Sequence, residues 1–291
     1  MQIKVATKLA PLATKFDAFI LDIWGVLMDG VTPYPGAPEC LQEMRGAGKR
    51  VILLSNAPRQ ASLVAERLQS IGIDRVLYDY ILTSGEASRL ALAKRTNPHI
   101  AALGRSYFYI GPSRDEDLLK GLDYVRTNNL EKADFVLATG VIDDTDKLDR
   151  YETYLQIAAI NQLSLICANP DNMVVRQNGD QVICAGAIAN RYQELGGTTH
   201  YFGKPYRTFY ETCLRQLKGV AQNRILAVGD TLHTDIKGAQ AVGLTTALVM
   251  GGILAKQLNI AWGEAPAPDR LEKLCTDQGI FPDFALPTFT W

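Results

Sequence analysis

Short, almost wholly apolar runs recur along the chain, and stretches with helical spacing separate them. Three runs, 17–22, 49–56 and 224–230, end in polar residues, and a fourth, 244–250, is followed by Gly251-Gly252. After the second run, apolar residues at helical spacing predict a helix over 58–71. Nearly all-apolar strands are typical of a parallel sheet covered on both faces, and strand–helix–strand order implies right-handed crossovers. The pattern therefore predicts an α/β fold with a doubly wound parallel sheet. From residue 263 onwards, four prolines predict a loop, a helix near 269–277 and an irregular end.

The middle of the chain carries strand and helix patterns of its own. Strand-like runs cover 106–111, 133–139 and 163–167, and a helical pattern precedes the last of them. Residues 173–176 and 181–184 flank Asn178-Gly179, a strong turn signal, and so predict a β-hairpin. We therefore predict an inserted α/β cap domain over residues 85–185, and a core domain made of residues 1–84 and 186–291.

Composition narrows the class of protein. The 291 residues include 30 Lys and Arg against 31 Asp and Glu, so the formal net charge is −1 and a nucleic-acid partner is not expected. The apolar runs have the length of strands and are too short to span a membrane. The five cysteines are odd in number and form no CxxC pair, which favours free thiols in a reducing cytosol. We predict a cytoplasmic protein without a membrane partner.

Polar residues stand where three of the core strands end. Asp22 closes the first run, Ser55 and Asn56 close the second, and Asp230 closes the third. In open α/β sheets, the ligand crevice lies at the carboxyl ends of the strands. These residues are therefore expected to converge on one site, although they lie far apart in the sequence.

Four segments carry a family resemblance, and they are listed by residue number as 21–27, 54–56, 202–205 and 228–235. Their order resembles the four motifs of the haloacid dehalogenase (HAD) superfamily. The insertion between the second and third motifs, which contains Asn169-Pro170-Asp171, is similar to that of subclass IIA. That subclass includes nitrophenylphosphatases, pyridoxal phosphatases, and sugar-phosphate and nucleotide phosphatases. The resemblance extends to about Gly252, which is most of the chain.

The resemblance implies a Mg²⁺-dependent phosphatase that hydrolyses a small phosphate monoester. Phosphoryl transfer consists mainly of positioning and charge stabilisation, and a carboxylate can serve as the nucleophile. By resemblance, the catalytic residues are Asp22 as the nucleophile that forms an aspartyl-phosphate, Ser55 as a hydrogen-bond donor to a phosphoryl oxygen, and Lys204 as the neutralising cation. The implied Mg²⁺ ligands are Asp22, Asp230 and the main-chain carbonyl of Trp24, with Asp235 orienting the metal's waters or Lys204. Substrate contacts are implied for Ser55, Asn56, Lys204, Asn169 and Asp171.

The first motif departs from the family pattern. Phosphatases of the superfamily carry Asp-x-Asp-Gly, whereas this chain has Asp22-Ile23-Trp24-Gly25. The second Asp normally protonates the leaving alcohol and then activates water, and an indole N–H can do neither. Because acid–base assistance is typically worth about 10²–10⁴-fold, three outcomes stay open: slow turnover, a preference for good leaving groups, or recruitment of another group such as Asp29.

Two alternative functions remain at this stage. The chain would be a phosphometabolite-binding or regulatory protein if the site is degenerate. It would be a dehalogenase-like hydrolase if the aromatic residue at position 24 matches the dehalogenase branch, which carries Tyr there and needs no acid. The expected partner in the leading interpretation is a small phosphorylated metabolite, and a homodimer stays open.

Overall fold

The computed structural model describes residues 3–175, 180–252 and 254–291. The chain divides into two compact units. The first comprises Met1–Ser55, Val64–Leu82 and Lys204–Trp291, and the second comprises Asn56–Leu63 and Thr83–Gly203. Among the described residues, none of the helices combines the length and the apolar character that crossing a bilayer requires. All five cysteines are free and buried.

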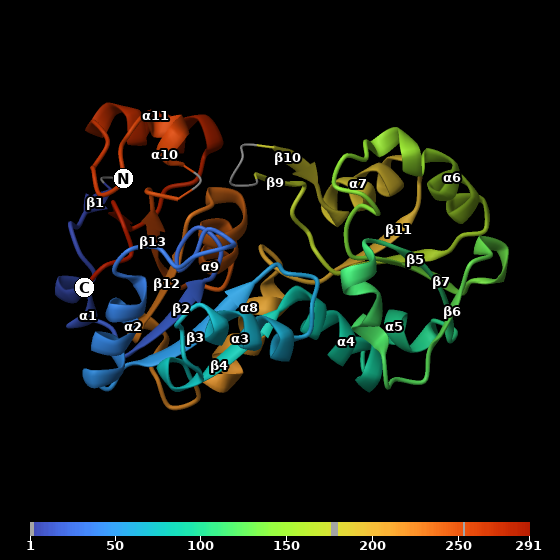
Figure 1. Ribbon diagram of the computed structural model, residues 1–291, viewed down its shortest axis with the longest axis horizontal. Coiled ribbons are helices and arrows are strands. Elements are labelled where there is room, and N and C mark those ends of the chain that lie inside the picture. Colours follow the sequence, from blue (N-terminus) through green and yellow to red (C-terminus); the bar gives the residue numbers. More distant parts are fainter. Residues whose placement is uncertain (1–2, 176–179, 253) are drawn as a thin grey trace. The chain divides into compact units, whose positions relative to one another are not determined.

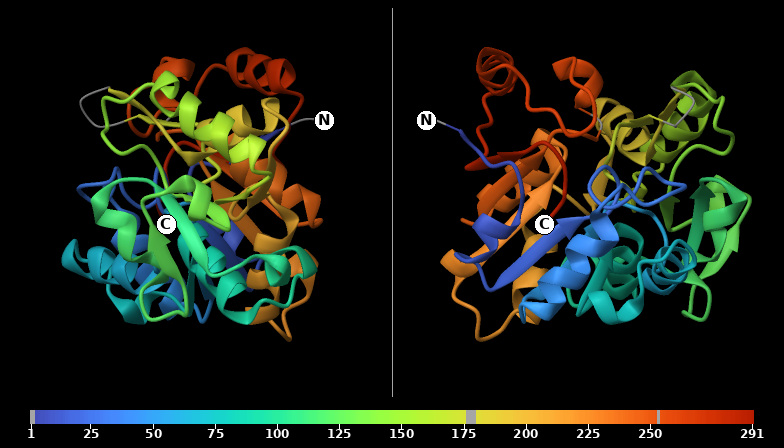
Figure 2. Two further views of the ribbon diagram at one scale, coloured as in Figure 1. Left: turned by 90° about the vertical axis from the view of Figure 1, so that its right-hand side faces the viewer. Right: turned by 60° about the vertical axis from the view of Figure 1, so that its left-hand side comes forward.

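The first unit is built on a seven-stranded sheet with the order β1-β14-β13-β12-β2-β3-β4. The strands are β1 (Lys4–Val5), β2 (Ala18–Asp22), β3 (Arg50–Ser55), β4 (Tyr80–Thr83), β12 (Ile225–Gly229), β13 (Thr245–Val249) and β14 (Phe284–Leu286). The pairs from β1 to β3 are parallel. Figure 1 shows the blue strands of the amino-terminal part beside the orange strands of the carboxyl-terminal part, and Figure 2 shows the same neighbours from other sides.

The strand order confirms the predicted doubly wound fold. From β2 the chain proceeds outward through β3 to β4, and from β12 it proceeds in the opposite direction through β13 to β14. Right-handed crossovers in opposite directions put the connecting helices on opposite faces of a sheet. The topological switch point therefore lies between β2 and β12, where the apolar strands are entirely buried.

Helices of the first unit follow the sequence signals closely. They are α1 (Ala10–Ala13), α2 (Ala37–Gly46), α3 (Ala61–Ser70), α8 (Arg207–Gln216), α9 (Lys237–Ala241), α10 (Ala255–Leu258) and α11 (Pro268–Gln278). In α2, a proline occupies the first turn and Cys40, Leu41 and Met44 form the buried face. The helix predicted near 269–277 is confirmed as α11. The prediction of an irregular end after this helix is wrong, because Phe284–Leu286 forms strand β14, which pairs with β13.

The second unit has a five-stranded sheet with the order β11-β8-β7-β5-β6. Its strands are β5 (Ser106–Ile110), β6 (Val125–Thr127), β7 (Phe135–Ala138), β8 (Ser164–Cys167) and β11 (Thr198–Tyr201), all paired in parallel. Its helices are α4 (Ser84–Lys94), α5 (Pro98–Ala102), α6 (Glu152–Ile160) and α7 (Ala185–Glu194).

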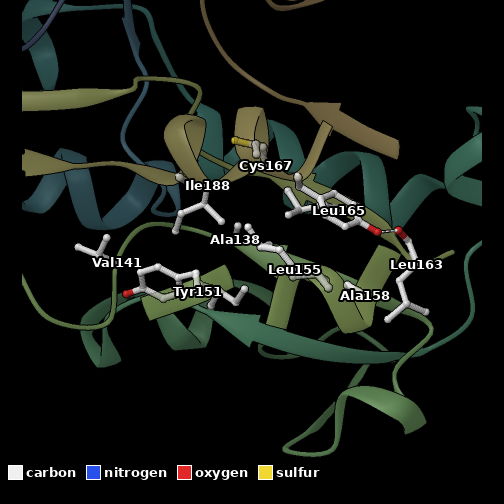
Figure 3. Close-up of a cluster of buried hydrophobic side chains, with 14 of the residues drawn as sticks. Ala138, Val141, Tyr151, Leu155, Ala158, Leu163, Leu165, Cys167 and Ile188 are labelled. Carbon is white, nitrogen blue, oxygen red and sulfur yellow. Dashed lines mark hydrogen bonds between the residues drawn. The ribbon is translucent and has the colours of Figure 1, made fainter. Parts of the chain in front are cut away.

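Alternate residues of β7 enter two different cores. Val136 and Ala138 join a cluster that includes Leu155 of α6 and Ile188 of α7, part of which is drawn in Figure 3. Phe135 and Leu137 join a second cluster with residues of α4 and α5. Because successive side chains of a strand point to opposite faces, this sheet is covered by helices on both sides.

The hairpin predicted in this unit is confirmed. Strands β9 (Met173–Val175) and β10 (Gln181–Ile183) are antiparallel, with Val174 opposite Val182. The predicted Asn178-Gly179 turn lies outside the described residues.

The sequence predicts that the chain returns to the core domain at residue 186, whereas in the structure it returns at Lys204. Tyr192 of α7 is fully buried in the core shown in part in Figure 3, and β11 pairs with β8 along its whole length. Residues 186–203 therefore belong to the second unit, and the first unit resumes at Lys204. The strand pattern that would have revealed β11 is weak, because Thr198–Tyr201 contains mainly polar and half-buried residues.

Candidate active site

Two acidic side chains lie at the switch point of the first unit. Asp22 is the last residue of β2, and Asp230 follows directly on β12, which pairs with β2. Ligand crevices of open α/β sheets form at this place because the loops diverge there. The predicted convergence of the two acids is thus explained by the register of the two central strands.

Lys204 joins the first acid to a third one. Its Nζ donates hydrogen bonds to Oδ1 of Asp22 at 2.5 Å and to Oδ1 of Asp235 at 2.7 Å. All three side chains are buried, and so is Asp230. Burial of an ammonium group between two carboxylates is favourable only when short, direct hydrogen bonds compensate for the lost hydration. Lys204 makes two such bonds, which hold its side chain at a fixed place beside Asp22.

The charges of this group perturb one another. Burial raises the pKa of Asp22 well above its usual value of 3.8, and the neighbouring Asp235 and Asp230 add to the effect of burial while Lys204 opposes it. Burial disfavours the charged form of Lys204, but Asp22 and Asp235 outweigh burial and hold the pKa of Lys204 well above 10.5. Perturbed groups that cluster at a strand-end crevice are typical of a functional site.

The acids also fit a divalent metal ion. One carboxylate oxygen from each of Asp22, Asp230 and Asp235 lies within 4.8 Å of the others. With Lys204, three carboxylates carry a net charge of −2, which a divalent cation would balance. Oxygen donors suit Mg²⁺. A side chain at Gly25 would place its Cβ 1.8 Å from Oδ2 of Asp230, so only glycine lets the main chain after Trp24 approach this acid.

Asp235 is engaged on both of its oxygens. Oδ1 accepts the hydrogen bond from Lys204, and Oδ2 accepts one from the main-chain N–H of Thr231 at 3.1 Å. It stands on a π-helical turn, Leu232–Ile236, whose main chain is held by a buried tyrosine: the hydroxyl of Tyr210 donates to the carbonyl of Asp235 at 2.9 Å. This arrangement suits a positioning residue for Lys204.

Tyr210 belongs to this site but could not be predicted from the sequence. It lies in α8 and is buried, and nothing in its local sequence distinguishes it from any other core tyrosine. It also lines a small cavity together with Asp22 and Asp235. Only the packing of α8 against the π-helical turn reveals its link to the site.

Trp24, at the position where the family has its second Asp, has 40% of its surface exposed. Its six-membered ring lies against Gly30, where a Cβ would come within 2.4 Å of Cζ3. The Asp29 carboxylate accepts hydrogen bonds from the main-chain N–H groups of Val31 and Thr32, each at 2.8 Å. Asp29 therefore shapes the loop that carries Trp24, and this is the role that the structure gives to the proposed substitute acid.

The other predicted site residues fall into two groups. Ser55 is buried at the end of β3 in the first unit. Asn56, Asn169 and Asp171 lie in the second unit and converge there: Nδ2 of Asn56 donates to Oδ1 of Asp171 at 2.8 Å, and the N–H of Asp171 donates to Oδ1 of Asn169 at 3.2 Å. The polar cluster of Asn56, Asn169 and Asp171 is thus a property of the second unit by itself.

A doubly wound core with an aspartate at the switch point, a buried lysine and two further acids defines the class of HAD-like hydrolases. Sequence profiles agree: one described as haloacid dehalogenase-like hydrolase matches residues 19–125, and one described as HAD-hydrolase-like matches residues 201–274. The chain belongs to the haloacid dehalogenase-like hydrolase family, and the prediction of subclass IIA is confirmed.

Individual relatives refine this picture. The crystal structure of a haloacid dehalogenase-like family hydrolase from Brucella suis 1330 is 32% identical, covers 98% of this chain and 100% of its own, and superposes with a TM-score of 0.82. The glycerol-3-phosphate phosphatase of Rattus norvegicus is 26% identical over 83% of this chain and 81% of its own. Phosphoglycolate phosphatase 2 of Arabidopsis thaliana is 24% identical over 95% of this chain and 96% of its own.

Proposed function

We propose that this protein is a Mg²⁺-dependent phosphatase that hydrolyses a small phosphate monoester through an aspartyl-phosphate on Asp22. The observation that carries the proposal is the buried Lys204 ammonium, which contacts both Asp22 and Asp235 beside Asp230. The similar proteins named as glycerol-3-phosphate and phosphoglycolate phosphatases support a small phosphorylated metabolite as the substrate.

In the first half of the reaction, a carboxylate oxygen of Asp22 attacks phosphorus. The bond from phosphorus to the leaving oxygen breaks, and its electron pair stays on that oxygen. Lys204 holds Asp22 in place and offers positive charge to the phosphoryl group. Mg²⁺ held by Asp22, Asp230 and the main-chain carbonyl of Trp24 would supply the remaining charge that lets two anions approach. Ser55 and the main-chain N–H of Asn56 donate to phosphoryl oxygens.

In the second half, water attacks phosphorus and gives up a proton to the solvent. The bond from phosphorus to the Asp22 oxygen breaks, which releases inorganic phosphate and restores the carboxylate. Asp235 keeps Lys204 oriented throughout. Asn169 and Asp171 stay predictions as substrate contacts. Turnover is expected to be slow for alkyl phosphates, because Trp24 offers neither a proton for the leaving oxygen nor a base for the water.

Trp24 also supports a second candidate function, a phosphometabolite-binding or regulatory protein whose site no longer turns over. A binder would retain affinity for a phosphorylated ligand through Lys204 and release no phosphate at any Mg²⁺ concentration. A dehalogenase-like hydrolase would instead release chloride from a 2-haloacid. These three outcomes are distinguishable with the unmodified protein.

The test is phosphate release from a panel of small phosphate monoesters, with and without Mg²⁺, by wild type, Asp22→Asn and Asp230→Asn. We expect both variants to fold and to lose turnover by at least about 10³-fold, as removal of a nucleophile or its partner usually does. Calorimetry should show that Asp230→Asn no longer binds Mg²⁺. Unchanged metal binding in this variant would contradict the assignment.

Asp17→Asn is the matched control. Asp17 directly precedes the same strand, β2, at its other end, and pairs with Arg224 at the surface. Loss of its charge should leave turnover and Mg²⁺ binding intact. If Asp17→Asn and Asp22→Asn lost activity alike, the effect would reflect the sheet and not the nucleophile.

The remaining proposals concern the protein's surroundings. Free, buried cysteines suit a reducing compartment, which supports the cytoplasm as the place where the protein acts. A homodimer stays a prediction, which the mass in solution would test.

A further inference from the structure

The second unit brings together two of the three histidines of the chain. His99 lies in helix α5, and His200 lies in β11, an edge strand of the five-stranded sheet (Figure 1). Their ring centroids are 5.8 Å apart, and the ring planes are 33° from parallel. Neither residue belongs to the candidate active site, so this pair of imidazoles is a separate feature of the molecule.

Two different elements hold the rings next to each other. Phe202, two residues after His200, packs against a buried cluster that contains Ile100 of α5. Because residues two positions apart in an extended chain lie on one face, His200 is on the side of the sheet that α5 covers. At the helix, Oδ1 of Asn97 accepts from the main-chain N–H of His99 at 2.9 Å and caps the first turn. The core of the unit therefore fixes the main chain under both rings.

Both imidazoles keep their ring nitrogens available to a ligand. Over residues 3–175, 180–252 and 254–291, neither ring makes a hydrogen bond or an ion pair. His99 is exposed, and the ring nitrogens of His200 are not among the buried side-chain atoms without a partner, so they reach solvent. Burial, and after it the neighbouring His99, lowers the pKa of His200 below its ordinary value of 6.5. A neutral imidazole is the form that binds metal ions.

The distance between the rings fits one metal ion held by both. Two imidazoles that share a tetrahedral zinc ion, each through a Zn–N bond of about 2.0–2.1 Å, have ring centres roughly 5–6 Å apart. The 5.8 Å between His99 and His200 falls within this range. Among the described residues, no third acidic, cysteine or histidine side chain completes a ligand group with them. Water would therefore fill the other coordination positions, as it does in open zinc sites.

We infer that His99 and His200 form a binding site for one Zn²⁺ ion, or for a similar transition-metal ion that prefers imidazole. The ion would join α5 to the edge strand β11 of the second unit. Imidazole nitrogens suit Zn²⁺, Ni²⁺ and Cu²⁺, whereas Mg²⁺ prefers oxygen ligands such as those of Asp22 and Asp230. The histidine pair and the acids of the first unit would thus select different ions, and this inference does not depend on the proposed function.

Calorimetry with Zn²⁺ tests the pair directly. Zn²⁺ is titrated, in excess Mg²⁺, into wild type, His99→Gln and His200→Gln. Loss of an outer partner of a metal ligand typically costs about 10–100-fold in affinity, and loss of a ligand itself should cost no less than the upper end of that range. We therefore expect each variant to lose about 100-fold or more of the affinity at one zinc site. A folded His99→Gln and a folded His200→Gln that both bind Zn²⁺ like wild type overturn the inference.

Two control variants distinguish this site from other places that could take up zinc. His233→Gln removes the remaining histidine of the chain, which is exposed in the first unit. Asp230→Asn removes one of the three clustered acids. Both should keep the zinc site that His99→Gln removes. If that site instead disappears in Asp230→Asn or His233→Gln, the ion binds at the acids and the inference is wrong.

Nuclear magnetic resonance of wild type gives an answer even if a variant fails to fold. Because the chain has three histidines, the ring-proton resonances are few and can be assigned individually. Zn²⁺ should shift the resonances of both His99 and His200, and Mg²⁺ alone should shift neither. Zn²⁺ that leaves either ring unshifted overturns the inference. Phosphatase activity enters neither measurement, so a failure of the proposed function would leave both results intact.

Discussion

Tyr210 is the buried residue that ties helix α8 to the turn carrying Asp235. Its hydroxyl donates to the carbonyl of Asp235 at 2.9 Å, and Asp235 in turn accepts the hydrogen bond from Lys204. Gly238 lies against the tyrosine ring, where a Cβ would come within 2.4 Å of Cε2. The position of Lys204 beside Asp22 thus depends on a phenol that holds the main chain of Asp235.

Tyr210→Phe should therefore keep the fold and impair the reaction. Loss of one buried hydrogen bond is expected to lower the free energy of unfolding by about 1 kcal/mol. Because the Tyr210 hydroxyl positions Asp235 and thereby Lys204, its loss is expected to lower kcat by roughly tenfold or more. Chemical denaturation and steady-state kinetics measure the two effects.

The control is Tyr192→Phe, since Tyr192 donates its hydroxyl to the carbonyl of Leu163 in the core of the second unit. It should lose comparable stability and no kcat. Equal kinetic losses in the two variants would mean that Tyr210 acts only through overall stability.

At the scale of elements, helices α6 and α7 of the second unit are joined by a bidentate ion pair. Arg191 donates from Nε to Oε2 of Glu152 at 2.9 Å and from Nη2 to Oε1 at 2.7 Å. The hydrogen bonds from Arg191 hold the pKa of Glu152 below its usual value of 4.5. Glu152 also lies in the first turn of α6, where a negative charge is favourable.

A depressed pKa in the folded state means that this pair stabilises the second unit above the unfolded pKa of Glu152. The stabilisation is lost as the pH falls through the lower, folded pKa. Glu152→Gln should therefore lower the melting temperature at pH 7. The difference from wild type should shrink as the pH falls below 4.5 and vanish only below the lower, folded pKa of Glu152. Glu194→Gln is the control: its carboxylate, 64% exposed, accepts one hydrogen bond from Arg191, so its effect should be smaller. A difference that persists at low pH would argue against the ion pair.

At the scale of the whole molecule, the second unit is a nearly continuous insertion with adjoining ends. The hydroxyl of Ser84 donates to the carbonyl of Phe202, so the chain enters and leaves this unit at neighbouring points. Each unit has its own sheet, and the second has cores on both faces of it. These are the properties of a domain that can be removed with a short linker.

Excision of residues 84–203 should consequently leave a core that unfolds cooperatively. Excision of 85–185 should not, because it would retain β11 without β8 and most of α7 without the core that buries Ile188 and Tyr192. Circular dichroism and thermal unfolding of both proteins, after size-exclusion chromatography, provide the comparison. Cooperative unfolding of the shorter excision alone would show that residues 186–203 belong with the core after all.

Sequence patterns were sufficient for the doubly wound sheet and the two central acids. Asp22 and Asp230 could be predicted because strand ends are visible as the points where apolar runs stop, and parallel strands bring those ends to one edge. The return from the second unit could not be predicted, because half-buried edge strands such as β11 carry no clear apolar run. Nor could β14, which is only three residues long and is fixed by its pairing with β13.

The sequence by itself therefore determined which residues can carry the chemistry: a strand-end aspartate, a lysine, two further acids and a tryptophan where an acid is usual. Tertiary structure decided how they act on one another. Lys204 lies 182 positions from Asp22, and only the folding of the first unit brings its ammonium to 2.5 Å from that carboxylate. Local patterns encode burial and turns, but distances between segments so far apart follow from packing, which no short stretch of sequence contains.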